Sequence, residues 1–431
     1  MININNCTGC SACYSICPTN CIAMEQDGEG FSYPIINDKN CTACTKCKSV
    51  CPAVIQGAAK KPLKVYAAKN PNDKIRLKSS SGGIFSLLSE SIVKEGGVVF
   101  GARFNDTWDV IHAYTETING LEAFRGSKYV QSSIGDTYRQ TKSFLDNNKK
   151  VLYSGTPCQV AGLKAYLQKD YPNLLAVDFV CKGVPSPLVW KKYLREFVDI
   201  TAFRQSNIKI FCINFRNKIY GWNSRLVFSV TYVVDKPMDA QSISNTVIYY
   251  NKQRKKRCDF NIVCSDKSKN LFTFFETSNT NSYMKGLLRN LYLRPSCYNC
   301  PAKSLKSGSD ITIADYWGIE SVLPEFNDKK GISLVLINTE KGSERYDLLD
   351  KNEHETTYAD GFAKNYRIEK SVLPYHTKRA LFFEKLNYEP VIPLIDKLTA
   401  VSLQIRFKKI IAAWLQRIGL LSFVNSLRKY K

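Results

Sequence analysis

Eight of the sixteen cysteines form two copies of one pattern, C-x2-C-x2-C-x3-C-P. The copies are Cys7, Cys10, Cys13, Cys17 with Pro18, and Cys41, Cys44, Cys47, Cys51 with Pro52, 34 positions later. This spacing is typical of [4Fe-4S] ligands: three thiolates of one tight loop bind one cluster, and the fourth cysteine of each run binds the other. The pattern therefore predicts that the chain carries single electrons.

The interleaved spacing also assigns the ligands. One cluster takes Cys7, Cys10, Cys13 and Cys51, and the second takes Cys41, Cys44, Cys47 and Cys17. Zinc sites usually add histidines or more widely separated C-x-x-C pairs, and disulfides need an oxidising compartment, so the duplicated run favours clusters. Cys21 lies outside the pattern, and we expect a small buried thiol near a cluster.

Length and composition predict a globular protein of two or three domains. The chain has 431 residues, of which 44% are hydrophobic, enough for a sizeable core. We see no secretion signal and no apolar run of the ~18 residues that a membrane span needs, so the expected location is cytoplasmic. The net charge of +23 suggests an acidic partner. No nucleic-acid-binding signature is present, which makes nucleic acid the least favoured partner.

The remaining pattern predicts a mixed α+β and α/β chain. A ferredoxin-type domain covers 1–57 and a linker 58–64, followed by an α/β domain in two parts, 65–160 and 161–395, and a C-terminal helix over 396–431. Strands are expected at 64–68, 98–104, 151–155 and 174–181, and a strand followed by a turn at 309–320 and again at 333–342. Helices are expected at 84–95, 134–147, 159–169, 187–198 and 281–293, and antiparallel strands within 205–285.

A second set of cysteines follows from this organisation. Strand, helix and strand over 151–181 form a βαβ unit, whose parallel strands bring Cys158 and Cys181 to one sheet edge. Cys297 and Cys300 add a C-x-x-C pair, and the four together suggest a third [4Fe-4S] cluster. The alternative is a reactive Cys158 and a separate redox pair.

Two polar segments suit a phosphate-bearing ligand. Ser81, Gly82 and Gly83 precede a helix, where free N–H groups favour an anion, and Gly126, Ser127 and Lys128 form a basic glycine turn. The plainer interpretations are a helix cap and a solvated turn.

Several segments together resemble the coenzyme F420 hydrogenase/dehydrogenase beta subunits and their bacterial relatives. They are SSSGGIFSLL, GGVVFGARF, FRGSKYVQS, YSGTPCQVAGLKAYL, VDFVCKGVPSP, CYNCPAK and DITIADYWGIE, and GTPCQVAG is the most specific. The resemblance runs from about Lys64 to Glu320, and a fused N-terminal ferredoxin module is common among bacterial members.

The resemblance implies FAD, bound non-covalently beside a cluster that Cys158, Cys181, Cys297 and Cys300 hold. The resemblance also implies which residues contact the flavin: Ser81, Gly82, Gly83, Gly126, Ser127, Lys128, Gly155, Thr156 and Trp317. Lys128, Lys182 and Asp315 are the candidate catalytic residues. Many relatives have histidine where this chain has Lys182, so its substrate chemistry is expected to differ.

The function that this implies is an iron–sulfur flavoenzyme. Electrons from a ferredoxin-type donor pass through the clusters to FAD and on to an unknown small-molecule substrate, and some relatives suggest surface-polysaccharide biosynthesis. The alternatives are an electron-transfer subunit that serves a separate partner redox enzyme, and a redox sensor with clusters but no flavin.

The C-terminal segment has a different character. From Lys397 to Lys431 it holds eight lysines or arginines and no acid, and apolar residues recur every three or four positions. This predicts a basic amphipathic helix. Two interpretations suit it equally. The helix lies on an anionic membrane surface as a peripheral contact, or it packs against the protein's own body or a partner protein.

Overall fold

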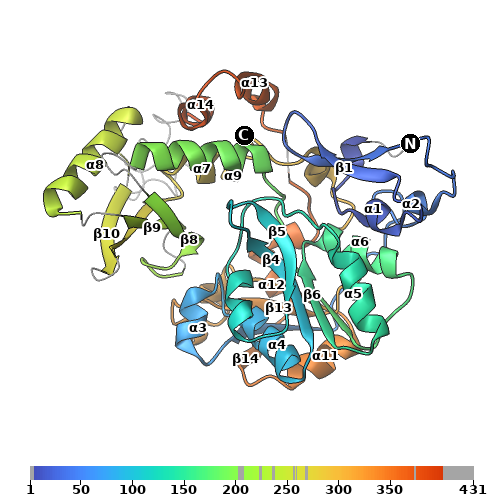
Figure 1. Ribbon diagram of the computed structural model, residues 1–431. Helices are drawn as coiled ribbons and strands as arrows, with labels where there is room; N and C mark the ends of the chain where they lie inside the picture. The colour runs from blue at the N-terminus through green and yellow to red at the C-terminus, as the bar shows by residue number, and fades with distance from the viewer. Residues whose placement is uncertain are drawn as a thin grey trace, which may run out of the picture.

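The fold is described from a computed structural model, which describes residues 4–201, 208–222, 226–234, 238–255, 258, 260–266, 270–372 and 375–400. Figure 1 shows three parts: a small N-terminal lobe, a large sheet flanked by helices, and a second, smaller sheet beside helices α7 and α9. None of the helices within these residues is long and apolar enough to cross a membrane.

Within the described residues, the strands form three sheets. The N-terminal hairpin is β1 (Ile22–Gln26) and β2 (Ser32–Ile36). The large sheet has the order β14 (Asn352–Glu355), β3 (Lys64–Lys69), β13 (Ser333–Ile337), β12 (Ile311–Asp315), β7 (Leu174–Phe179), β6 (Val151–Gly155), β4 (Val98–Phe104) and β5 (Val110–Thr115). The smaller sheet has the order β10 (Phe260–Asp266), β11 (Leu271–Thr277), β9 (Val227–Val234) and β8 (Ile208–Asn217), all antiparallel.

Helices cover both faces of the large sheet and one side of the smaller one (Figure 1). Those of the N-terminal half are α1 (Ala12–Ile16), α2 (Lys46–Ser49), α3 (Asp73–Lys78), α4 (Ile84–Lys94), α5 (Thr137–Asp146), α6 (Pro157–Leu167) and α7 (Pro187–Thr201). Those that follow are α8 (Ala240–Gln253), α9 (Ser282–Leu288), α10 (Ile319–Val322), α11 (Glu340–Asp347), α12 (Tyr358–Lys364), α13 (Arg379–Lys385) and α14 (Val391–Leu398).

The centre of the large sheet is parallel. Strands β4, β6, β7 and β12 run in one direction, and β5, β13, β3 and β14 complete the sheet by antiparallel pairing. The expected βαβ unit is confirmed, because β6 and β7 pair in parallel across α6. The carboxyl ends of the four parallel strands meet at one edge, which is where sheets of this kind bind ligands.

The sequence placed most of these elements correctly but missed others. The helix expected at 134–147 begins at Thr137, and the one at 281–293 ends at Leu288. The stretch 205–285 does contain antiparallel strands, yet α8 interrupts them. The proposed boundary at 160 falls inside α6. Residues 401–431, most of the expected C-terminal amphipathic helix, lie outside the described residues.

The N-terminal lobe packs on the large domain through its first cysteine run. Cys10, Ala12 and Val50 share a hydrophobic core with α5, α6 and the neighbouring strands. Gly162, the last residue of GTPCQVAG, makes this approach close: a Cβ there would lie 2.9 Å from Cys10 Sγ and 3.0 Å from the Tyr138 hydroxyl. The glycine therefore lets α6 lie directly against the first cluster loop.

Replacing Gly162 by valine tests this contact. We expect a loss of about 1–3 kcal/mol in the free energy of unfolding from overpacking, together with reduced iron content. The free energy of unfolding should fall even though the helix propensity of valine is better than that of glycine by a few tenths of a kcal/mol. Denaturant unfolding of anaerobically purified protein measures it.

Gly28→Val is the matched control, since nothing lies within 4 Å of a Cβ at Gly28. Equal unfolding midpoints for the Gly162→Val variant and the control would contradict the assigned contact.

Candidate iron–sulfur centres

The twelve cysteines that the sequence assigned to clusters fall into three sets. We call them the distal set (Cys17, Cys41, Cys44, Cys47), the middle set (Cys7, Cys10, Cys13, Cys51) and the inner set (Cys158, Cys181, Cys297, Cys300). Among the described residues, no three His, Cys, Asp or Glu side chains converge tightly enough to hold a single metal ion. A four-iron cluster does not need side chains that converge on one point, because its four thiolates bind four different iron atoms.

The middle set is gathered and largely buried. Cys10 and Cys13 interact electrostatically with each other and with Cys7, and Cys51 interacts with Cys7 and Cys13. Burial raises the pKa of Cys13 to about 12 and that of Cys10 still further. Such thiols stay protonated when alone, so iron is the partner that would convert them to thiolates.

The distal set lies at the outer end of the lobe. Cys41 and Cys44 are exposed, whereas Cys17 is buried. Cys44 interacts electrostatically with Cys17 across the lobe, and Cys47 interacts with Cys13 and Cys51 of the middle set. Cys47 therefore lies on the side of the distal set that faces the middle set, and the grouping of the ligands stays a prediction.

The inner set lines one pocket at the carboxyl edge of the large sheet. Cys158 lies at the start of α6, Cys181 follows β7, and Cys297 and Cys300 come from the loop after α9; all four line this pocket. Each of Cys158, Cys181 and Cys297 interacts electrostatically with Cys300. The parallel pairing of β6 and β7 thus brings together the residues that the sequence placed at one edge.

Local backbone geometry holds the inner set in place. Thr156 caps α6 by a reciprocal pair with Gln159 and lies 3.1 Å from Cys158 Sγ. The Val184 N–H donates to Cys297 Sγ, with 3.4 Å between nitrogen and sulfur. A Cβ added to Gly183 would lie only 3.1 Å from the Cys297 Cβ. Backbone N–H groups near a cluster sulfur are a common means of tuning such a site.

Two lysines line the same pocket. Lys303 Nζ donates to the carbonyls of Cys181 and Arg367, each at 2.6 Å. Lys182 Nζ donates to the carbonyl of Leu288 at 2.8 Å, and burial, with the charge of Arg367 beyond it, lowers the pKa of Lys182 to about 8. A four-thiolate cluster carries net negative charge, so these cations would stabilise one in this pocket.

The middle and inner sets are neighbours. Cys10 interacts electrostatically with Cys158, and Thr8, between Cys7 and Cys10, lines the inner pocket. Arg294 joins the two loops: this fully buried side chain donates to the carbonyls of Cys7 (2.8 Å) and Ser32 (3.0 Å) and to Gln131 (3.1 Å). Arg294 was not predicted from the sequence, although it lies three residues before Cys297.

The residues assigned to the flavin come from separate segments, two of which meet. Ser127 N–H and hydroxyl both contact the Ser80 hydroxyl, at 2.8 and 2.9 Å, so FRGSKY lies against SSSGG. Ser81 donates to the Ile332 carbonyl, and a Cβ at Gly82 would collide with the Ala68 carbonyl oxygen. The space beside Gly126 is open, with φ at +86°.

Lys128, the third residue of that turn, is bound within it. Its Nζ donates to the carbonyls of Ala123 (2.8 Å) and Arg125 (3.1 Å). Burial lowers the pKa of Lys128 to about 7. The charge of Cys212 raises this pKa in part, and the positive charge of Arg125 lowers it further.

Asp315, at the carboxyl end of β12, reaches the smaller sheet. It accepts from Arg216 Nη1 at 2.7 Å and from Trp222 Nε1 at 3.2 Å. Trp317 stacks on Trp222 with ring centres 5.5 Å apart, and the Arg216 guanidinium lies 5.3 Å from the Trp317 ring. Arg216 Nη2 is buried without a hydrogen-bond partner. No motif pointed to Arg216, which lies more than 90 residues from Asp315.

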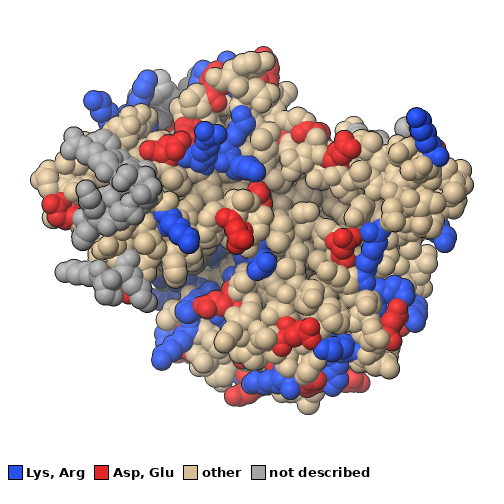
Figure 2. All heavy atoms as spheres, in the orientation of Figure 1, with Lys and Arg blue, Asp and Glu red and all other residues tan. Residues whose placement is uncertain are grey.

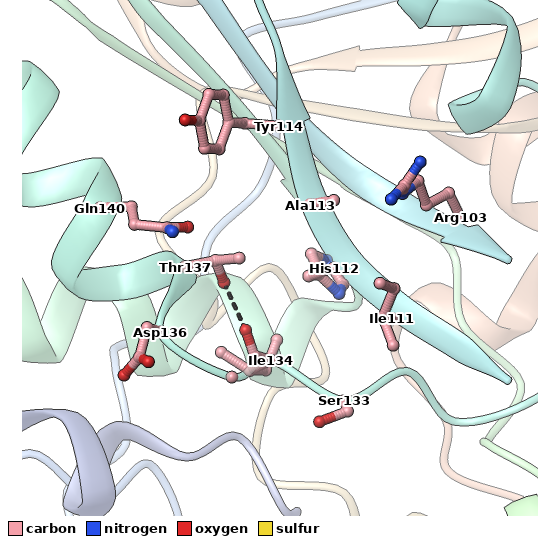
Figure 3. A pocket seen from close by; sticks show the side chains of 11 residues that line it. Arg103, Ile111, His112, Ala113, Tyr114, Ser133, Ile134, Asp136, Thr137 and Gln140 are labelled. Carbon is pink, nitrogen blue, oxygen red and sulfur yellow. Dashed lines mark hydrogen bonds between the residues drawn. The ribbon is translucent and has the colours of Figure 1, made fainter. Parts of the chain in front are cut away.

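A further pocket lies at edge strand β5, apart from the cysteines (Figure 3). Arg103, His112 and Tyr114 line it together with the start of α5, where the Thr137 hydroxyl donates to the Ile134 carbonyl at 2.8 Å. His112 Nε2 lies 3.0 Å from the Ser154 carbonyl, so this nitrogen carries the proton, and burial lowers the pKa of His112 to about 4. The ring is therefore neutral near pH 7.

Comparison with known proteins identifies two domains. Residues 148–360 match the family model for the C terminus of the coenzyme F420 hydrogenase/dehydrogenase beta subunit, and residues 6–55 match the model for a 4Fe-4S dicluster domain. A chain of the F420-reducing [NiFe] hydrogenase complex from Methanosarcina barkeri is similar at 16% identity, with a TM-score of 0.41, over 78% of this chain and 96% of that chain. None of the curated proteins matches. The resemblance drawn from the sequence and the expected N-terminal iron–sulfur domain are confirmed.

Replacing Arg294 by glutamine should loosen the lobe from the large domain. The change leaves buried carbonyls without donors, at about 1–3 kcal/mol for an unsatisfied acceptor. We expect faster tryptic cleavage after Lys60, between the lobe and β3, followed over time by electrophoresis.

Arg345→Gln serves as the control, because Arg345 pairs with Glu95 at the surface, where an ion pair contributes about 0–1 kcal/mol. If both variants are cleaved at the wild-type rate, Arg294 does not hold the two parts together.

Proposed function

We propose that the chain, whose residues 148–360 match the family model for the C terminus of the coenzyme F420 hydrogenase/dehydrogenase beta subunit, is an iron–sulfur flavoprotein oxidoreductase. In this proposal it takes electrons from a ferredoxin-type donor and reduces a small substrate, for which we propose a sugar-linked compound of surface-polysaccharide biosynthesis. The observation that carries the proposal is the row of three cysteine sets, which leads from the exposed end of the lobe to the carboxyl edge of the large sheet.

The distal set suits the entry of electrons. Cys41 and Cys44 are exposed, and Lys39, Lys46 and Lys48 are exposed around them. Figure 2 shows that the lobe carries few charged side chains on the visible face, with basic side chains at its far tip. A weak encounter with an acidic donor needs such a basic, otherwise uncharged surface, because opposite charge speeds association without binding too tightly.

The inner set supports a third [4Fe-4S] cluster rather than a reactive thiol beside a separate redox pair. All four thiols line one pocket, and Lys182 and Lys303 supply positive charge there. Burial raises the pKa of Cys158 to about 12 and that of Cys181 to about 11, which opposes a free thiolate nucleophile. Iron is the partner that these four side chains fit.

The flavin assignment rests on residues that fit a phosphate-bearing cofactor. Helix α4 begins after Gly83 without a side-chain cap, so its first N–H groups are available to an anion. Gly126 leaves open space beside Ser127, and Arg216 Nη2 is a buried donor without an acceptor. With Gly155, Thr156 and Trp317, these are the groups that would hold FAD; such a flavin couples one-electron transfer to two-electron chemistry.

We assign roles at this edge to three charged residues. Asp315 is fixed by Arg216 and Trp222, so it holds the smaller sheet and Trp317 against the site. Lys128 has a pKa of about 7 and can therefore exchange a proton at physiological pH. Lys182, in place of the histidine of many relatives, keeps a cation in the inner pocket.

The first test is the cofactor content of anaerobically purified protein. At four irons for each cluster, we expect about twelve irons and one FAD per chain. Cys158→Ala should lose about four irons while the remaining clusters still bleach with dithionite, because the first two clusters use none of the inner thiols. Iron, sulfide and released flavin are measured with the visible spectrum.

Cys212→Ala is the control, since Cys212 belongs to none of the three sets. About eight irons and no flavin in the wild type would contradict the proposal and favour a redox sensor. Twelve irons and FAD without turnover of any small substrate would favour an electron-transfer subunit for a partner enzyme.

A second test concerns Arg216. Arg216→Lys keeps a positive charge for Asp315 but removes the unpartnered Nη2, so we expect less flavin per chain at unchanged iron content. Arg345→Lys is the matched control at a surface ion pair. Equal flavin in the two variants would show that Nη2 does not hold the cofactor.

A further inference from the structure

Lys218, at the end of the smaller sheet, holds the backbone of the large domain beside α4. It directly follows β8 and is half-buried. Its Nζ donates to the carbonyls of Arg76 at 2.8 Å, Ser81 at 2.8 Å and Lys330 at 2.7 Å. A lysine ammonium group has three N–H donors, so each of them has one acceptor here. A single side chain therefore binds three points of the large domain.

The segments that supply these carbonyls are also bonded to one another. The Arg76 side chain is 2% exposed, donates to the Gly331 carbonyl at 2.8 Å and pairs with Asp328. Helix α3, which carries Arg76, is thereby joined to the turn 328–331, which carries the third acceptor of Lys218. Lys218 thus binds a backbone unit that other hydrogen bonds already hold together.

The bonds of the segment before α4 hold its carbonyl side. Lys218 binds the Ser81 carbonyl, and the Asn70 N–H donates to the Gly82 carbonyl at 2.7 Å. In a trans peptide unit the N–H points opposite to the C=O, so the Gly83 N–H is turned the other way. Helix α4 follows without a side-chain cap. These contacts therefore fix the segment and leave N–H groups at its other side for an anion.

The charge of Lys218 depends on its surroundings. Burial and the positive charges of Arg76 and Arg216 lower the pKa of Lys218, the carboxylates of Asp315 and Asp328 raise it, and the resulting pKa is about 7. Hydrogen bonds from a charged donor are stronger than those from a neutral one. The three bonds are therefore strongest below pH 7, where the amine is charged.

We propose that Lys218 is a positioning residue for the flavin, which fastens the smaller sheet to the segment that binds the cofactor's phosphate groups. The same end of β8 carries Arg216, which pairs with Asp315 at 2.7 Å. Docking of the smaller sheet and binding of FAD then stabilise each other, and linkage makes this coupling act in both directions. The inference rests on the proposed flavin site.

The first test measures the affinity for FAD at a pH below 7. Lys218→Met removes the donors, and we expect the dissociation constant of FAD to rise about tenfold, the effect of losing one hydrogen bond to a charged group. Iron content should stay that of the wild type. Lys218→Arg should restore most of the affinity, because a guanidinium keeps the charge and donates to several acceptors. The rise in flavin fluorescence on dilution of the anaerobic holoprotein gives the constant.

Lys192→Met is the matched control, because Lys192 also donates to a backbone carbonyl, that of Leu386 at 3.1 Å, in another part of the fold. It should bind FAD as the wild type does. A wild-type protein that neither contains nor binds FAD would overturn the flavin proposal itself. With FAD bound to the wild type, equal dissociation constants for Lys218→Met and Lys192→Met would overturn this inference alone.

Hydrogen exchange tests the reverse direction of the coupling and needs no variant. FAD should slow amide exchange over 208–222, which contains β8 and the Trp222 N–H that donates to the Lys329 carbonyl at 2.9 Å. Lys218→Met should lose most of this slowing, whereas a purely structural role would speed exchange equally with and without FAD. If FAD binds the wild type and leaves exchange over 208–222 unchanged, Lys218 does not couple the two sites, whether or not Lys218→Met folds.

Discussion

The arrangement of the cysteine sets depends on one buried cation. Arg294 lies in the loop that carries Cys297 and Cys300, and its guanidinium reaches the carbonyls of Cys7 and Ser32 in the N-terminal lobe. The Tyr33 ring lies over it at 4.2 Å. A planar fork of five donors can satisfy several acceptors at once, which a lysine cannot do. The distance between the middle and inner sets is therefore fixed by side-chain chemistry as well as by chain connectivity.

Part of the chain's positive charge lies inside the fold, close to the cysteine sets. Its +23 charge looks extreme for a protein that packs compactly, yet several cations lie inside the fold. Lys182 and Lys303 face the inner thiols, Arg294 faces the middle ones, and Arg216 faces Asp315. Three four-thiolate clusters would each add about two negative charges, so these positions are where the excess is needed. The exposed lysines near Cys41 lie apart from these buried cations.

Prediction from the sequence succeeded best where chemistry imposes a spacing. The duplicated cysteine run and the strand–turn–helix at GTPCQVAG follow local rules, and the structure brings Cys158 and Cys181 together as parallel pairing requires. Arg294, Arg216 and Gly162 escaped prediction because each acts across a distance of many residues that no local pattern encodes. Helix α8 was missed because its β-branched and aromatic residues resemble those of the strands around it, and packing on α7 and the smaller sheet decides its form.

The exposure of the thiols differs among the three sets, and this difference has a physical consequence. Cys41 and Cys44 are exposed, Cys10 and Cys13 are buried, and the inner thiols are half-buried beside cations. Solvent exposure, net charge and hydrogen bonds to sulfur set the reduction potential of a cluster. With three different environments in one chain, clusters held by these sets would need no difference in ligand type to differ in potential. Helix α6 then links the last two, because Gly162 touches Cys10 at one end of the contact while Cys158 opens the same helix. A single helix thus positions a thiol of the inner set and the surface on which the middle set rests, so the two sets stay close while the lobe packs on α6.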